Sequence, residues 1–155
     1  MGVYSVRGFT TATASAADET VCALWNPHAT RRIQVLEFGV YRTGITGLIP
    51  TIDGITARGT AGSTVTPDAD NGWDTDDTPP SGVLLDLAAY SVAPTFAAPR
   101  LFGARLGGGT GSGGSGYVWV FASGLALPPS RGLALRSRAV EVWTASEVYY
   151  VWEEN

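Results

Sequence analysis

Short apolar segments separated by glycine, proline and aspartate run along the whole chain, and they limit its fold more than any other feature. Strand-like segments occupy residues 3–7, 21–25, 31–43, 100–106, 117–122, 132–138 and 148–152. Turn residues end them, and no segment sustains a helical period. Helix and buried strand compete in residues 83–90, where we predict a strand. This pattern predicts an all-β chain, an antiparallel β-sandwich of jelly-roll type with little or no helix.

The length of 155 residues fits a single domain, residues 1–155, with one hydrophobic core. Composition favours strands and tight turns, because 20 residues are Gly, 9 are Pro and all 10 basic residues are Arg. Cys22 is the one cysteine, so no disulfide can form within the chain. We expect its side chain to behave as a small buried hydrophobe.

Charge and hydropathy narrow the choice of partners. The net charge of −4 and the pI near 4.8 argue against binding to nucleic acid or to anionic lipid. No apolar run approaches the ~20 residues of a membrane-spanning helix. The start of the chain, MGVYSVRGFT, lacks the basic residues and apolar stretch of a signal peptide. We therefore expect a soluble protein made in the cytoplasm without export, with no nucleic acid or membrane as partner.

The segment 31–43 has apolar alternation that changes phase in the middle. Ile33 and Val35 share one face of an ideal strand, whereas Leu36, Phe38 and Val40 share the other. Two explanations are open: a β-bulge near Val35 and Leu36 restores the register, or both faces of the strand are covered.

Two strands near the C-terminus have apolar residues on both faces, which a two-layer sandwich can cover on one side only. In residues 117–121 three aromatic residues oppose two valines, and in 148–152 a second set does the same. Self-association would cover the second set, and coverage by the chain's own loops is the alternative. The candidates for an oligomer or partner interface are Tyr117, Trp119, Phe121, Tyr149, Tyr150 and Trp152.

Three segments are predicted to be irregular. Residues 1–20 are expected to form an extended N-terminal arm or an edge strand, and residues 107–116 a flexible glycine-rich loop. Residues 67–80 form an acidic loop, which we interpret as solvated. Its carboxylates are also the candidates for a calcium site, although their spacing does not match an EF-hand. These residues are Asp68, Asp70, Asp74, Asp76 and Asp77.

Residues for catalysis are sparse. His28 is the one imidazole and follows a turn, and no pairing of a nucleophile with a base can be argued from the sequence. We expect no enzyme activity, no cofactor and no metal centre. Glu153 and Glu154 are expected at the solvated surface. Four arginines are expected to pair with acids across a subunit contact: Arg31, Arg32, Arg136 and Arg138.

Three segments carry a family resemblance. LALPPSRGLALRSRA at 125–139, followed by VYYVWEE at 148–154, resembles the end of small jelly-roll structural proteins of tailed bacteriophages. Residues 55–71 and VAPTF at 92–96 are similar to the same group. Some members serve as capsid decoration or cement proteins. The resemblance implies a homo-oligomer, often a trimer, on the capsid exterior that bridges subunits of the major capsid protein and has no catalytic residues.

Two hypotheses of function follow. The first is a virion structural protein of the decoration or cement type. The second is a carbohydrate- or receptor-binding β-sandwich module, associated with a tail or fibre or cellular, in which Trp73 or Trp143 stacks on a sugar.

Overall fold

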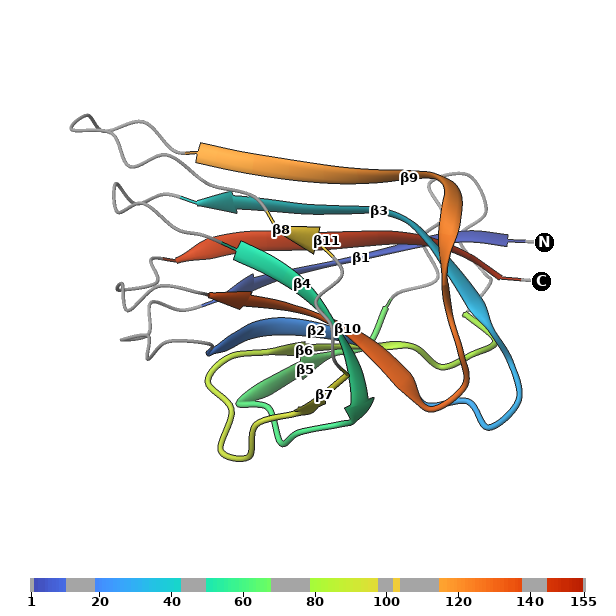
Figure 1. Ribbon diagram of the computed structural model, residues 1–155, viewed down its shortest axis with the longest axis horizontal. Helices are drawn as coiled ribbons and strands as arrows, with labels where there is room; N and C mark the ends of the chain where they lie inside the picture. The colour runs from blue at the N-terminus through green and yellow to red at the C-terminus, as the bar shows by residue number, and fades with distance from the viewer. Residues whose placement is uncertain are drawn as a thin grey trace.

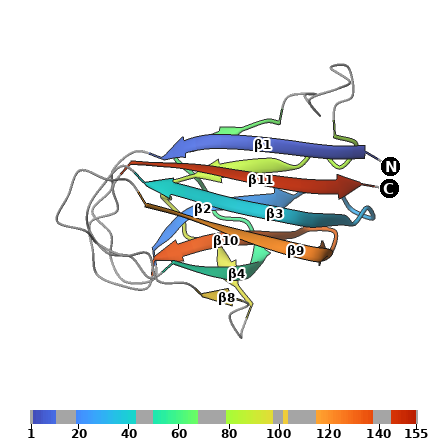
Figure 2. The same cartoon turned by 90° about the horizontal axis from the view of Figure 1, so that it is seen from above.

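The strands form two antiparallel sheets that pack face to face (Figures 1 and 2). The computed structural model describes residues 2–10, 19–42, 50–67, 79–97, 102–103, 115–137 and 145–154. The four-stranded sheet has the order β1 (Gly2–Thr10), β11 (Ser146–Glu154), β3 (Ile33–Arg42), β9 (Ser115–Leu127). The described ranges contain no helix, and hence none long and apolar enough to cross a membrane.

The second sheet has seven strands. Its order is β5 (Ser63–Val65), β6 (Leu84–Leu87), β2 (Thr20–Asn26), β10 (Arg131–Ser137), β4 (Pro50–Ala57), β7 (Thr95–Phe96), and β8 (Phe102–Gly103) also pairs with β4. The strand predicted in residues 83–90 is confirmed as β6. Of the strand predicted at 100–106, the described residues contain β8 alone.

Strand pairing is nested from the ends of the chain inwards. β1 pairs with β11, β2 with β10, β3 with β9 and β4 with β8, and each successive pair changes sheet. This is one long hairpin rolled into two layers, which defines a jelly roll. The β5–β6 pair is an addition beside β2. The predicted all-β antiparallel sandwich of jelly-roll type is confirmed. The strand predicted at 3–7 lies within β1.

The core lies between the sheets and is built by period-two alternation. In β11, Val148, Tyr150 and Trp152 point inward and are fully buried, whereas the residues between them are at least partly exposed. Phe38 of β3 stacks on Tyr150 at a centroid distance of 4.4 Å and on Trp119 of β9 at 5.1 Å. Burial of each such ring contributes about 1.5–3 kcal/mol to stability, so this stack is a main tie within the four-stranded sheet.

A β-bulge at Leu36 resolves the phase change in β3. Val35 pairs with Trp152 and Glu37 pairs with Val151, so Leu36 is an extra residue between consecutive partners on β11. With this extra residue, the apolar residues on both sides of the bulge point into the core. The predicted bulge is confirmed.

Strand β9 bends sharply where it pairs with the bulge. Val120 pairs with Glu37 and Leu125 pairs with Val35, which leaves residues 121–124 out of register. Gly124 has a φ of 69°, in the left-handed region that favours glycine. Figure 1 shows β9 turning downwards in the view after a long straight first part. The strand is therefore longer than the predicted segment 117–122.

Candidate functional site

The outer face of the four-stranded sheet exposes large apolar side chains. Val3 and Phe9 of β1 are 47% and 59% exposed, Tyr41 of β3 is 48% exposed, and Val120 of β9 is 69% exposed. All four side chains point away from the core, as alternation along their strands requires. We refer to these four residues as the apolar outer face. Charged residues lie between them on the same face, among them Arg7, Glu37 and Glu147. The face is a candidate for contact with a partner, because large apolar side chains are more often buried than exposed.

Two tyrosines lie flat on the two inner strands of this sheet. Tyr149 of β11 covers Gly39 on β3, and Tyr41 covers Gly116 on β9, so that a Cβ at either glycine would collide with a ring. The two rings are nearly parallel, with an interplanar angle of 14° and centroids 6.1 Å apart. Cross-strand pairs of an aromatic residue with glycine stabilise a sheet, and here they also create a flat aromatic platform.

The platform has a carboxylate beside it. The hydroxyl of Tyr149 donates a hydrogen bond to Glu37 Oε1. Partial burial raises the pKa of Tyr149, and the hydrogen bond to Glu37 raises it further. The tyrosine therefore stays a neutral donor at any physiological pH. Arg7 and Glu147 form a loose ion pair nearby, with Nη1 and Oε1 3.9 Å apart and both side chains exposed.

Of the six aromatic residues expected at an interface, three lie in the core instead. Trp119 is 7% exposed, and Tyr150 and Trp152 are fully buried, so a partner of the folded chain would not reach them. They lie on the inward face of their strands, and alternation alone does not say which face that is. Phe121 and Tyr149 are half-buried and Tyr117 is 41% exposed, so these three remain accessible.

No match is found when the chain is compared with protein-family models, with curated proteins and with solved structures. Function is therefore argued from the residues of this chain. Within the described ranges, no group of three or more His, Cys, Asp or Glu side chains could hold a metal ion. The calcium candidates at positions 68, 70, 74, 76 and 77 lie outside these ranges, as do Trp73, Trp143, Arg138, residues 11–18 and the glycine-rich segment 107–114.

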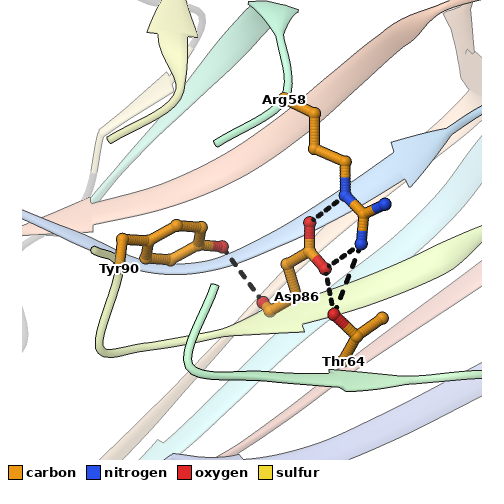
Figure 3. Close-up of polar contacts among 4 residues, drawn as sticks. All are labelled: Arg58, Thr64, Asp86 and Tyr90. Carbon is orange, nitrogen blue, oxygen red and sulfur yellow. Dashed lines mark hydrogen bonds and ion pairs between the residues drawn. The ribbon is translucent and has the colours of Figure 1, made fainter. Parts of the chain in front are cut away.

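An ion pair with a buried carboxylate lies on the outer face of the seven-stranded sheet, because Asp86 of β6 alternates with the core residues Leu85 and Leu87. Figure 3 shows its contacts. Arg58 donates two hydrogen bonds of 2.7 Å to Asp86, one to each carboxylate oxygen, and Thr64 Oγ1 donates a third at 2.7 Å. Asp86 is 1% exposed, and the Tyr90 hydroxyl donates to its carbonyl oxygen at 3.2 Å. The hydrogen bonds that Arg58 donates to Asp86 raise the pKa of the guanidinium. With both carboxylate oxygens engaged, the group ties β6 to the chain around β5.

A second buried carboxylate corrects an expectation about Arg136. Arg136 Nη1 lies 2.8 Å from Asp53 Oδ2 within the same chain. The guanidinium of Arg136 lies over the ring of Phe96, 3.8 Å from the ring centroid. Asp53 is 1% exposed and sits on β4, next to β10. The arginine therefore stabilises this chain, where we expected a contact between subunits.

Glu154 corrects a second expectation, because it is 3% exposed and not a surface residue. Its Oε2 accepts a hydrogen bond from the Ser81 backbone N–H at 2.9 Å, and its Oε1 accepts bonds from Ser81 Oγ at 2.5 Å and Trp152 Nε1 at 2.8 Å. The carboxylate fastens the segment before β6 to the end of β11. Sequence patterns could not indicate this contact, since the two groups are 73 residues apart.

The side chains of Cys22 and His28 are both engaged in the fold. Cys22 is fully buried, and burial raises the pKa of its thiol from 9.0 to about 12. His28 lies in the turn after β2, where its Nδ1 accepts hydrogen bonds from the backbone N–H groups of Thr30 at 3.1 Å and Arg31 at 2.9 Å. The predictions of a buried cysteine and of a turn histidine are confirmed.

The exposed residues of β1 and β3 are the part of the site that sequence reasoning missed. Residues 3–9 have the same two-sided pattern as the C-terminal strands, with Val3 and Phe9 on one face and Tyr4 and Val6 on the other. When the criterion of apolar residues on both faces is applied to residues 3–9, it finds two of the four exposed residues, Val3 and Phe9.

Proposed function

We propose that the chain is a non-catalytic structural protein of a virus particle, a decoration or cement protein on the outside of a capsid. It forms a homo-oligomer and binds subunits of the major capsid protein. The observation that carries the proposal is the apolar outer face. The segment resemblance to phage structural proteins supports it, and the jelly roll is compatible with it, because viral capsid proteins and lectins both use this fold.

Burial energetics favour the apolar outer face as the surface that meets the capsid. Each Å² of apolar area removed from water contributes about 25 cal/mol, so covering several large side chains is a substantial driving force. The exposed pair Arg7 and Glu147 lies on the same face and adds polar groups of both signs. Mixed charge around an apolar patch is typical of protein interfaces, where it favours specificity over affinity.

A co-sedimentation experiment tests the proposal. Assembled capsid shells of the source phage are mixed with the chain, with Phe9→Asp and with Val92→Asp as the matched control. Val92 is as exposed as Phe9, at 59%, but lies in the loop between β6 and β7. We expect the wild type and Val92→Asp to sediment with the shells and Phe9→Asp to bind at least about tenfold more weakly. A wild-type chain that fails to bind shells and is missing from purified virions would refute the proposal.

The aromatic platform favours a second candidate function, the binding of a carbohydrate. Tyr41 and Tyr149 present flat rings beside the carboxylate of Glu37, and sugars are bound by stacking on aromatic faces together with hydrogen bonds to such groups. A glycan array separates the two functions. Binding that is lost in Tyr41→Ala and kept in Tyr117→Ala would favour this candidate, whereas an array without any signal removes it.

A further inference from the structure

We propose that a cleft beside β4 and β10 binds a medium-chain aliphatic carboxylate, with the hydrocarbon chain in the cleft and the carboxylate on Arg131. The cleft has a volume of about 240 Å³. Its walls are the C-terminal half of β4, the start of β10 and the bent end of β9, which Figure 1 shows descending to the start of β10. No lining residue belongs to the apolar outer face, so the site is separate from the surface proposed to meet the capsid.

Gly54 of β4 extends the cleft towards the core. Ile52 is fully buried between the sheets, and Gly54 lies two positions further on the same face, so a side chain at position 54 would point inward. Among the described residues, a Cβ added at Gly54 would meet a single atom within 4 Å, the Cβ of Ala97 at 3.8 Å. The inward space at this position is therefore part of the cleft and not of the packed core.

The strand itself does not require a glycine at this position. At the other glycines whose surroundings the structure gives, either φ is positive or an added Cβ would come within 2.9 Å of another atom. Gly54 has neither constraint, and its pairing with Leu133 on β10 is regular. A glycine inside a strand lowers stability and often marks a place where a ligand approaches closely. We therefore interpret the missing side chain as space for a ligand.

The lining selects an apolar ligand of limited size. Leu127 and Leu133 are buried core residues, Leu125 packs against the same core, and Pro128 completes this side of the cleft. The volume exceeds the ~150 Å³ of an engineered apolar cavity that takes up benzene, and it lies below the ~300 Å³ at which sites for drug-sized molecules begin. A single aliphatic chain fits between these limits.

Arg131 supplies a charge at the mouth of the cleft. It lies two positions before Leu133, hence on the inward row of β10, and it is exposed at the end of that row. Among the described lining residues it is the only one with an ionisable side chain. Its Nη1 donates a hydrogen bond to the Ser130 carbonyl oxygen at 2.9 Å. A guanidinium binds a carboxylate through two parallel hydrogen bonds, so the head group of the ligand is a carboxylate and not a hydroxyl.

Isothermal titration calorimetry of the full chain with butanoate, hexanoate, octanoate and decanoate tests the inference. We expect the Kd to fall about fourfold for each added methylene until the cleft is filled. The neutral 1-octanol should bind at least about tenfold more weakly than octanoate. The inference is overturned if none of the four carboxylates binds at millimolar concentration, if the Kd does not depend on chain length, or if 1-octanol binds as tightly as octanoate.

Gly54→Val distinguishes a ligand site from a glycine that the fold requires. Valine favours a strand and its side chain would occupy the cleft, so we expect a Tm at least as high as that of the wild type and a Kd for octanoate at least about tenfold higher. Ala57→Val is the matched control, because Ala57 is exposed on the same strand and does not line the cleft. A Gly54→Val chain that keeps its affinity for octanoate, or that fails to fold, contradicts the inference.

Arg131→Gln tests the head group on an exposed residue, where folding is not at risk. We expect it to weaken octanoate about tenfold and to leave binding of 1-octanol unchanged, whereas Arg32→Gln, at another exposed arginine outside the cleft, changes neither. Equal affinities for octanoate in the two variants would remove the role of Arg131.

Nuclear magnetic resonance of the wild type locates the ligand independently of any variant. We expect octanoate to shift the amide signals of Gly54 and Leu133. Shifts confined to the apolar outer face would overturn the inference. Shell binding is measured separately, so the proposed function stands or falls without this site.

Discussion

Two arginine–carboxylate pairs of this chain differ in how far water surrounds them. Arg58 meets a carboxylate that is 1% exposed, with two hydrogen bonds of 2.7 Å, whereas Arg7 meets Glu147 at 3.9 Å with both groups in solvent. Loss of the cation leaves an uncompensated buried charge in the first pair and a hydrated carboxylate in the second. The two pairs are therefore a matched test of what burial does to an ion pair.

We expect Arg58→Met to lower the free energy of unfolding by about 3 kcal/mol, because Asp86 stays buried without its partner. Arg7→Met should change it by less than about 1 kcal/mol. Urea unfolding at neutral pH measures both values. Equal effects in the two variants would show that water reaches Asp86 more freely than its exposure indicates.

Cys22 gives a prediction in the dependence on pH. Burial raises the pKa of its thiol from 9.0 to about 12 in the folded state, so folding favours the protonated form. The contribution of the Cys22 thiol to the free energy of unfolding is fully present below pH 9 and is lost as the pH rises from 9 towards 12. At pH 8.5 we expect a thiol reagent to label the chain only as fast as it unfolds, and rapid labelling in urea. Fast labelling of the native chain would contradict the buried position.

Among the elements, β3 shows how one inserted residue keeps a strand in register with the core. The bulge at Leu36 lets Val35 and Phe38 both point inward, although they are three positions apart and an odd spacing places residues of a regular strand on opposite faces. Without Leu36, the order Val35, Glu37, Phe38 would alternate regularly. Their partners on β11, Trp152 and Val151, are already consecutive, so the pairing of β11 with β3 would keep its register.

Deletion of Leu36 should therefore leave a cooperative fold, with a loss of about 1–2 kcal/mol from altered strand curvature. Deletion of Val151, which lies opposite on β11, is the matched control. It would turn Trp152 from the core to the solvent side, and we expect that chain not to fold. Thermal unfolding followed by circular dichroism separates the two. A Leu36 deletion as damaging as that of Val151 would mean that the bulge is required for the bend of β9.

Alternation along single strands explains how much of the structure could be predicted. It identified the main strands and the bulge, because both depend on residues near in sequence. It did not show which face of β11 is buried, so Tyr150 and Trp152 were expected at an interface. Nor did it find the buried carboxylates of Asp86 and Glu154, whose partners lie 28 and 73 residues away. The position of β9 at an edge is likewise a property of the assembled sheet.

For the whole molecule, nested pairing brings the two ends of the chain together. Gly2 pairs with Glu154 at the end of the first and last strands, and Figure 1 shows both termini on the same side. Each sheet takes strands from both halves of the chain, so neither half contains a complete layer. The order of the strands in space, and not the place where the chain starts, then determines the fold.

A circular permutant tests this directly. A short glycine-rich linker joins the old termini, and new ends are opened between Ala29 and Thr30, both exposed in the turn after β2. We expect this permutant to fold cooperatively with a loss of no more than about 2 kcal/mol. Opening the chain between Ala134 and Leu135, both buried in β10, is the control that should fail. If the exposed permutant fails as well while the linear chain folds, the first strand must dock before the others, and folding depends on chain order as well as on the nested pairing.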